Sequence, residues 1–405
     1  MNQRLFTSLL LFIGLLLGKV AFPADVIAAA ASSGLSIEVF PQVSYIFGEQ
    51  VSFDVEVKSE AQIDEAYLVY QPEGSESRVI PMQIDQNRLA VDLDLNQTRI
   101  PPFSRVAYWF QLKPQGADLI TSASYAFNYD DNRFEWQTLE NEQLAVFWHD
   151  GDLAFGQSAL NTGINGLETA SGLLGTAAPS QQIRIYIYPS TQELQSALEI
   201  SGQPWLAGHA SPQLGIVLVS IAPNADQRLR MEQQIPHELV HVMLYQSVGK
   251  DYDRIPPWLN EGLATLAELY PNADYANVLV TAGKNNTLLP MSSLCSPFPM
   301  DASRAFLSYA QSASFTRFLQ QKYGVSGIQN LLLKYSDGLG CSEASFAAFG
   351  KPLASLESDW KEETLGISSS LDALRRIAPY LLLFAVLLLP VLIIGIGRLF
   401  SSKKG

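Results

Sequence analysis

The chain has 405 residues, of which 47% are hydrophobic and only 16% are charged, and its formal net charge is −14. This length allows two or three domains, and a charged fraction well under the roughly 25% of ordinary soluble domains indicates that part of the chain lies in lipid. The acidic balance supplies no basic surface for phosphate backbones, so nucleic acid is excluded as a partner, and the abundant aliphatic and aromatic residues exclude intrinsic disorder.

Residues 1–31 have the pattern of a secretory signal peptide. Arg4 precedes an apolar run from Leu5 to Gly18, and small residues follow at the usual cleavage positions around Ala28. An uncleaved amino-terminal anchor is the alternative, although the apolar run is short for a membrane span. Both interpretations predict that the following segment leaves the cytoplasm.

Residues 32–150 show the alternation of half-buried strands. From Val51 to Val57 apolar residues alternate with polar ones, and the same period of two recurs at 66–70, 89–95, 106–112 and 124–129. Strands at this spacing, without helical stretches among them, predict an all-β antiparallel sandwich of immunoglobulin or fibronectin type. We interpret His149, at the end of this region, as a packing residue at the domain boundary.

After residue 150 the pattern changes to helices mixed with fewer strands, which predicts an α+β domain over residues 151–370. Its first expected elements are a helix from Leu153 to Leu174 ended by Gly175, a strand from Ile183 to Tyr188, a helix from Thr191 to Ile200 capped by Ser190, and a strand from Gly215 to Ile221.

Two of the four histidines fall in the segment His-Glu-Leu-Val-His at 237–241, an H-E-x-x-H pattern. Chance predicts roughly 0.004 such patterns in a chain of this composition. On a helix, residues four apart share a face, so His237 and His241 can bind one metal ion with Glu238 beside them. Because proline is tolerated only in the first turn or at a kink, Pro236 predicts that this helix begins near Ile235.

A third metal ligand follows in the sequence. Catalytic zinc needs three protein ligands and an open position. Glu261 is separated from His241 by 19 residues and lies in Trp-Leu-Asn-Glu-Gly-Leu-Ala-Thr at 258–265, which opens a second helix. Two imidazoles and one carboxylate form a donor set of metal-assisted hydrolysis, and Glu238 is then expected to be the general base that takes a proton from the attacking water.

These motifs resemble the gluzincin metallopeptidases of the peptidase MA-like superfamily, in which a helix bearing H-E-x-x-H is followed by a helix that supplies a glutamate ligand. The segment at 258–264 is similar to the W-L-N-E-G-[FL]-A stretch of aminopeptidase N-like enzymes. The resemblance implies zinc ligation by His237, His241 and Glu261, general-base action by Glu238, and support of the second helix by Asn260. The order of export signal, β-domain, peptidase domain and anchor resembles membrane-anchored prokaryotic members of this superfamily.

Two departures from the family pattern bear on function. The G-[AG]-M-E-N segment that captures a free amino terminus in the aminopeptidase N group is absent, which favours cleavage inside peptide chains. Thermolysin-like enzymes have an aspartate four residues past the glutamate ligand, where this chain has Thr265. Glu268, two turns from Glu261 on the same face, either orients a ligand imidazole instead or is an ordinary partly solvated carboxylate.

The resemblance also suggests contacts with substrate. The strand from Gly215 to Ile221 corresponds to the edge strand that binds substrate through main-chain hydrogen bonds, and His209 near its start is a candidate for contact with substrate. Tyr309 resembles the position of an oxyanion-stabilising phenol, the alternative being a core tyrosine.

Cys295 and Cys341 make an even number of cysteines in an exported chain. They are expected to form a disulfide in an oxidising compartment, which would be worth roughly 4 kcal/mol on the chain-entropy estimate. Two reduced, buried thiols are the alternative.

Residues 377–397 form a run of 21 residues without a charge, long enough as a helix to cross a hydrocarbon core of about 30 Å. This run predicts a transmembrane helix, in contact with membrane lipid, with residues 398–405 as a cytoplasmic tail. A buried core helix is the alternative interpretation.

The sequence therefore predicts a single-pass protein of the cell membrane whose extracytoplasmic zinc metallopeptidase domain acts on peptides or proteins. Hydrolysis of a non-peptide amide or ester would use the same metal chemistry. The alternative from another functional class is a catalytically inactive binding or scaffold protein of the cell envelope on a peptidase fold.

Overall fold

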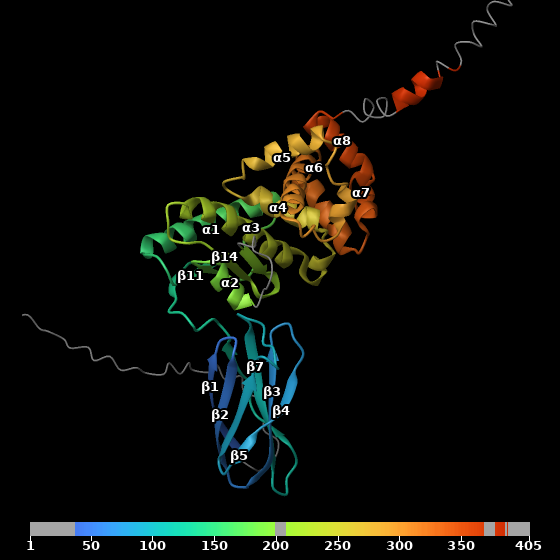
Figure 1. Ribbon diagram of the computed structural model, residues 1–405. Coiled ribbons are helices and arrows are strands. Elements are labelled where there is room, and N and C mark those ends of the chain that lie inside the picture. Colours follow the sequence, from blue (N-terminus) through green and yellow to red (C-terminus); the bar gives the residue numbers. More distant parts are fainter. Residues whose placement is uncertain (1–36, 199–207, 368–376, 385–386, 388–405) are drawn as a thin grey trace, which may run out of the picture. The chain divides into compact units, whose positions relative to one another are not determined.

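The computed structural model describes residues 37–198, 208–367, 377–384 and 387. Contacts within the chain divide it into two compact units, the first ending at Arg133 and the second beginning at Phe134. Figure 1 shows strands in the first unit and both helices and strands in the second. The expected signal peptide and cytoplasmic tail, at 1–31 and 398–405, lie outside the described residues.

The first unit consists of two antiparallel sheets. Their strand orders are β1-β2-β6-β5 and β4-β3-β7-β8, and β9 also pairs with β7. The first sheet contains β1 (Ile37–Ile46), β2 (Gln50–Ser59), β5 (Gln83–Asp85) and β6 (Arg88–Asp94). The second contains β3 (Ile63–Pro72), β4 (Arg78–Pro81), β7 (Arg105–Pro114), β8 (Ile120–Thr121) and β9 (Tyr125–Asn128).

Alternation along the strands builds the core of the first unit. In β2, Val51, Phe53, Val55 and Val57 are buried, whereas the residues between them are at least partly accessible. The ring of Phe53 lies 5.1 Å from that of Tyr108 in β7, so side chains from the two sheets meet. The expected antiparallel β region is confirmed, and its immunoglobulin or fibronectin type stays a prediction.

The second unit contains a five-stranded sheet of order β10-β11-β12-β14-β13. Its strands are β10 (Gln137–Glu140), β11 (Leu144–Trp148), β12 (Ile183–Tyr188), β13 (Gly208–Ser211) and β14 (Ile216–Ser220). The three central strands are parallel, and the two edge strands pair antiparallel with their neighbours. Because β11 pairs with β12, the second unit begins before the domain boundary that the sequence places at residue 150.

The helices of the second unit begin with α1 (Leu153–Leu174), which has the bounds that the sequence predicts. It ends at Gly175 in the left-handed conformation, with φ 64°. In α2 (Thr191–Leu198) the Ser190 hydroxyl accepts from Glu193 N–H at 3.3 Å, as its predicted capping role requires. The later helices are α3 (Gln227–Val248), α4 (Pro257–Ala267), α5 (Asp274–Lys284), α6 (Ala302–Ser336), α7 (Cys341–Phe349) and α8 (Leu353–Leu365).

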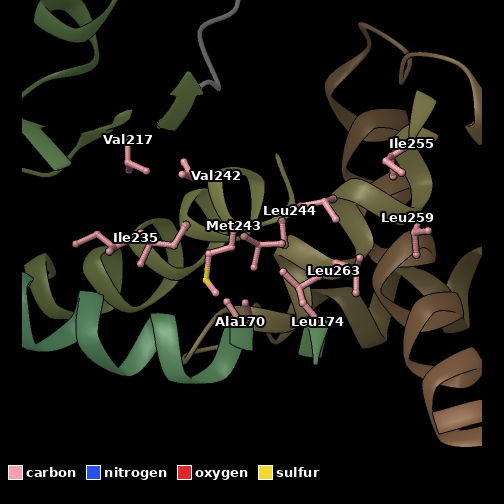
Figure 2. Close-up of a cluster of buried hydrophobic side chains, with 14 of the residues drawn as sticks. Ala170, Leu174, Val217, Ile235, Val242, Met243, Leu244, Ile255, Leu259 and Leu263 are labelled. Carbon is pink, nitrogen blue, oxygen red and sulfur yellow. The ribbon is translucent and has the colours of Figure 1, made fainter. Parts of the chain in front are cut away.

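One apolar core joins α1, α3, α4 and the sheet. Figure 2 shows Leu174 of α1, Met243 of α3 and Leu263 of α4 in this buried cluster. Helices α1 and α3 approach closely where Gly166 faces Pro236, because a Cβ at this glycine would lie 3.1 Å from the proline. The apolar side chains of α3 are buried on several sides of the helix. This burial fixes the orientation of α3 and hence the direction of its polar side chains.

Cys295 and Cys341 form the expected disulfide, with Cα atoms 6.2 Å apart. It joins the short 3-10 helix η3 (Met291–Cys295) to the beginning of α7. Among the described residues no helix is both long and apolar enough to span a membrane. The expected transmembrane segment, 377–397, lies mostly outside the described residues, so its role stays a prediction.

Candidate metal centre

Helix α3 carries the H-E-x-x-H segment and is longer than the sequence predicts. It begins at Gln227, so the expected helix start near Ile235 is wrong. Pro236 lies inside the helix and cannot donate the N–H that the Glu232 carbonyl would otherwise accept. That carbonyl instead accepts a hydrogen bond from Leu269 N–H at 2.8 Å. A contact from outside the helix therefore satisfies the group that the proline leaves without a helical donor.

His237, His241 and Glu261 bring three metal-binding atoms together. Their ligand atoms all lie within 4.8 Å of one another. Glu261 Oε2 is 3.3 Å from His237 Nε2 and 3.8 Å from His241 Nε2. The two imidazoles lie one helical turn apart on α3, with ring centroids separated by 5.2 Å, and α4 supplies the carboxylate.

Each imidazole has its own acceptor at Nδ1. His237 Nδ1 donates to Glu268 Oε1 at 3.3 Å, and His241 Nδ1 donates to Asn260 Oδ1 at 2.9 Å. Nε2 is therefore the atom that each ring offers to a metal ion. Glu268 contacts the imidazole of a candidate ligand, as one of its two sequence interpretations predicts.

Asn260 of α4 links His241 to a tyrosine, and its predicted support of the second helix stays a prediction. Its Oδ1 accepts from His241, and its Nδ2 donates to the Tyr252 hydroxyl at 2.8 Å. Tyr252 lies in the 3-10 helix η2 (Gly249–Arg254), and no sequence pattern indicates it. Burial raises the pKa of this hydroxyl, so it stays neutral beside the imidazole.

Proton affinities in the cluster are strongly shifted. Burial lowers the pKa of His237, but the carboxylates of Glu261 and Glu268 outweigh burial and raise it to about 10. Burial raises the pKa of Glu261, but His241 and His237 outweigh it and hold this pKa below its ordinary value. His237 and Glu261 consequently form a pair of opposite charges, and a metal cation would meet the same carboxylate.

Glu238 is buried beside these residues and has a carboxyl group of raised pKa. Burial is the main cause, and the neighbouring His237 and His241 oppose it. The carboxylate lies against Gly208, the first residue of β13, because a Cβ at Gly208 would be 2.5 Å from Glu238 Oε1. A buried carboxyl group with a raised pKa is suited to proton transfer near neutral pH.

The edge strand beside the site is not the one that the sequence indicates. β14, at Ile216–Ser220, lies inside the sheet, because β13 pairs with its outer side. The expectation that the strand over 215–221 is the edge is therefore wrong. His209 belongs to the edge strand β13, and burial, with a smaller contribution from His241, lowers the pKa of its imidazole.

Tyr309 reaches the cluster from α6. Its ring centroid is 6.3 Å from that of His237, and the ring of Phe298 packs edge-on against it at 5.2 Å. Burial and the carboxylates of Glu261 and Glu238 raise the pKa of its phenol, which therefore stays protonated. The structure places Tyr309 beside the candidate ligands, and its role in oxyanion stabilisation stays a prediction.

Gly262 explains how α4, which carries the candidate ligand Glu261, packs against α6. A Cβ at Gly262 would collide with the Thr316 hydroxyl and with the Ser312 carbonyl, both on α6. Glycine therefore lets α4 and α6 approach closely enough to bring Glu261 and Tyr309 to the same site.

His149 takes no part in this cluster. Its Nε2 lies 3.0 Å from Glu193 Oε2, and its ring stacks on Phe134 with centroids 4.0 Å apart. Both contacts agree with the predicted packing role.

The donor set fits a zinc ion. Two imidazole nitrogens and one carboxylate oxygen are ligands of catalytic zinc, and the acceptors at Nδ1 are the outer partners that such histidines usually have. The arrangement is typical of zincins.

Comparison with known proteins gives one family. A model described as the Peptidase MA superfamily matches residues 163–366, which include all of α3, α4 and α6. No curated protein matches the sequence. Among solved structures, the chain is similar to one titled "Crystal structure of Br derivative BhCBM56", with a TM-score of 0.18 and 8% identity over 22% of this chain and 88% of that chain.

Proposed function

The chain belongs to the Peptidase MA superfamily, and on this premise we propose that it is a zinc metallopeptidase with His237, His241 and Glu261 as ligands. The observation that carries the proposal is the convergence of their donor atoms within 4.8 Å, with an acceptor already at each Nδ1. When bound, zinc supplies Lewis acidity, which polarises a carbonyl and lowers the pKa of a coordinated water.

Glu238 is the general base. It follows His237 on α3, and burial raises the pKa of its carboxyl group towards the range in which proton transfer is efficient. It takes a proton from the attacking water and delivers that proton to the leaving amine. The contact with Gly208 limits the positions that the carboxylate can occupy.

Tyr309 is the proposed oxyanion donor. Its raised pKa keeps the phenol protonated, so it can donate a hydrogen bond to the negative charge that develops on the scissile carbonyl oxygen. Its support is that the ring, carried by α6, has its centroid 6.3 Å from that of His237.

The test is the metal content of the purified protein together with peptide hydrolysis. Elemental analysis should find about one zinc per chain, and replacing both His237 and His241 with alanine should abolish zinc binding and hydrolysis. His149→Ala is the matched control, because this histidine packs on Phe134 away from the cluster and should leave the zinc content unchanged. Stoichiometric zinc in the double variant would refute the ligand assignment. Zinc binding without hydrolysis of any peptide in a diverse library would favour an inactive binding protein.

The proposed substrate is a peptide bond inside a chain. The sequence lacks the segment that binds the substrate ammonium group in aminopeptidase N-like enzymes, so acetylation of the substrate should remove little binding energy. Acetylated and free-amine forms of one cleaved peptide should react at similar rates. Release of single residues from the free-amine form alone would contradict endopeptidase action.

The proposal includes a membrane anchor at residues 377–397 with the peptidase outside the cytoplasm. Its support is the uncharged run of 21 residues, the secretory pattern at 1–31 and the Cys295–Cys341 disulfide, which suits an oxidising compartment. External protease should degrade the peptidase domain in intact cells, and removing residues 377–405 should release it from the membrane fraction. Protection of the domain from protease, or recovery of the full chain in the soluble fraction, would contradict this arrangement.

A further inference from the structure

Pro236 occupies an unusual place, immediately before the first candidate ligand and within the body of α3. Its ring is buried and faces Gly166 of α1, whose missing Cβ leaves the room that the proline fills. A proline at this point gives up one helical hydrogen bond, because it has no N–H for the Glu232 carbonyl.

The Glu232 carbonyl accepts a hydrogen bond from a segment outside α3. Leu269 N–H donates to it at 2.8 Å, just beyond the end of α4. A regular helix would direct this carbonyl along its own axis to the N–H of residue 236, whereas a proline ring pushes the carbonyl four residues earlier away from the axis. The hydrogen bond therefore ties α3 to the chain that leaves α4.

This connection ends beside a candidate ligand. Glu268 immediately precedes Leu269, and Glu268 Oε1 lies 3.3 Å from His237 Nδ1. The side chain of Glu268 is 8% exposed, so its direction depends on the backbone that carries it. Pro236, His237, Glu268, Leu269 and Glu232 form a closed circuit of covalent bonds and two hydrogen bonds.

We propose that Pro236 is a positioning residue of the metal centre. By withholding a helical N–H from the Glu232 carbonyl, it reserves that carbonyl for Leu269, and the resulting hydrogen bond aligns the Glu268 carboxylate with His237. This inference rests on the proposed zinc site. It adds that Pro236 affects the metal affinity of that site through Glu268.

Alanine at position 236 supplies the missing N–H. The Glu232 carbonyl then regains its helical donor and turns towards the helix axis, and the contact with Leu269 weakens. Loss of an outer partner of a ligand histidine typically lowers metal affinity by 10-fold to 100-fold. Pro236→Ala should therefore weaken zinc binding about tenfold, as should Glu268→Gln, which keeps the shape of the side chain but removes its charge.

The experiment measures the zinc dissociation constant of the purified full chain by competition with a chelator, for wild type, Pro236→Ala, Glu268→Gln and the double variant. The visible absorption of the cobalt-substituted forms reports on the ligand field without requiring turnover. Leu269→Pro removes the N–H donor of the same hydrogen bond. Proline is suited to position 269 because the residue before it, Glu268, already has an extended ψ, with φ −54° and ψ 121°. Ile235→Val is the control for a small loss of core packing and should leave zinc affinity unchanged.

Three results support the proposal together. Pro236→Ala and Leu269→Pro should each weaken zinc binding about tenfold, and both should shift the cobalt spectrum as Glu268→Gln does. The variant that combines Pro236→Ala with Glu268→Gln should bind zinc no more weakly than whichever single variant has the lower zinc affinity, because both substitutions interrupt one connection. Wild-type affinity in folded Pro236→Ala, or a double variant about 100-fold weaker than wild type, would overturn it. If His237→Ala retains zinc, the proposed function itself fails, a result that is independent of Pro236.

Discussion

The two units of the molecule bury charge in different ways. In the first unit, Asp131 is fully buried and Arg133 donates two side-chain hydrogen bonds to it, at 2.8 Å and 2.6 Å. In the second, His237 and Glu261 lie 3.3 Å apart within a group that also contains His241 and Glu238.

The difference lies in where the polar atoms point. Asp131 and Arg133 direct hydrogen-bonding atoms at each other within the segment that follows β9. In the second unit three donor atoms from α3 and α4 are directed at one point. Burial of charge is therefore common to a structural pair and to a candidate site, and convergence of donor atoms distinguishes the site.

The largest expected effect in the second unit follows from removing the proposed base. Glu238→Gln should lower kcat/KM for a cleaved peptide by about 10³-fold or more, while zinc remains bound. Its thermal stability should stay at the wild-type value or rise, because an amide replaces a buried carboxyl group of raised pKa. Kinetics, elemental analysis and calorimetry on the same samples test this, and unchanged kcat/KM would assign the base elsewhere.

The matching change in the first unit should affect stability alone. Asp131→Ala leaves the Arg133 guanidinium without its buried partner and should lower the free energy of unfolding by about 3 kcal/mol. Zinc content should not change. Asp54→Ala is the control, because its pair with Arg88 is exposed and should contribute less than about 1 kcal/mol. Denaturant unfolding measures both, and equal losses would show that burial does not separate the two pairs.

Close packing behind the ligands should have a smaller effect. Gly262→Ala inserts a methyl group between α4 and α6 and should lower the free energy of unfolding by about 1–3 kcal/mol. Gly172→Ala in α1 is the matched control, because its added methyl group meets nothing within 4 Å and should stabilise the helix slightly. A neutral Gly262→Ala would show that α4 can move away from α6 without loss.

The smallest effect concerns the acceptor of the second imidazole. Asn260→Ala removes the shorter contact of His241 Nδ1, at 2.9 Å, leaves the Tyr252 hydroxyl at 3.4 Å, and should weaken zinc binding about tenfold. Asn272→Ala, at an asparagine whose side chain accepts from Asp274 N–H, serves as the control. Identical zinc affinities for the two variants, measured by chelator competition, would mean that Asn260 acts only on Tyr252.

Local signals predict much of this molecule. The bounds of α1 follow from a periodic apolar face and from Gly175, and the donor set follows from the spacing of His237, His241 and Glu261. Both depend on residues close in sequence or on a strongly specific pattern. The partner of Asn260 at Tyr252 and the contact of Gly208 with Glu238 depend on chain packing, and no local pattern indicates either.

Pro236 shows most clearly where local rules stop. Judged from helix geometry alone, Pro236 should begin or interrupt α3. The helix nevertheless starts at Gln227 and continues through Pro236. The compensating donor, Leu269 N–H, comes from a segment that follows α4. The sequence does not reveal the edge of the sheet for a similar reason, because strand neighbours are set by pairing between distant segments and β13 is only four residues long.

Gly208 offers a way to capture what the enzyme acts on. The nearest atom to an added methyl group is the end of the Glu238 side chain, which can move aside without disturbing the backbone. Gly208→Ala should therefore fold and keep the three candidate ligands in place while displacing the carboxylate of the proposed base. Such a variant would hold its physiological peptide or protein without releasing products, and could be used as bait to recover that molecule from the native compartment.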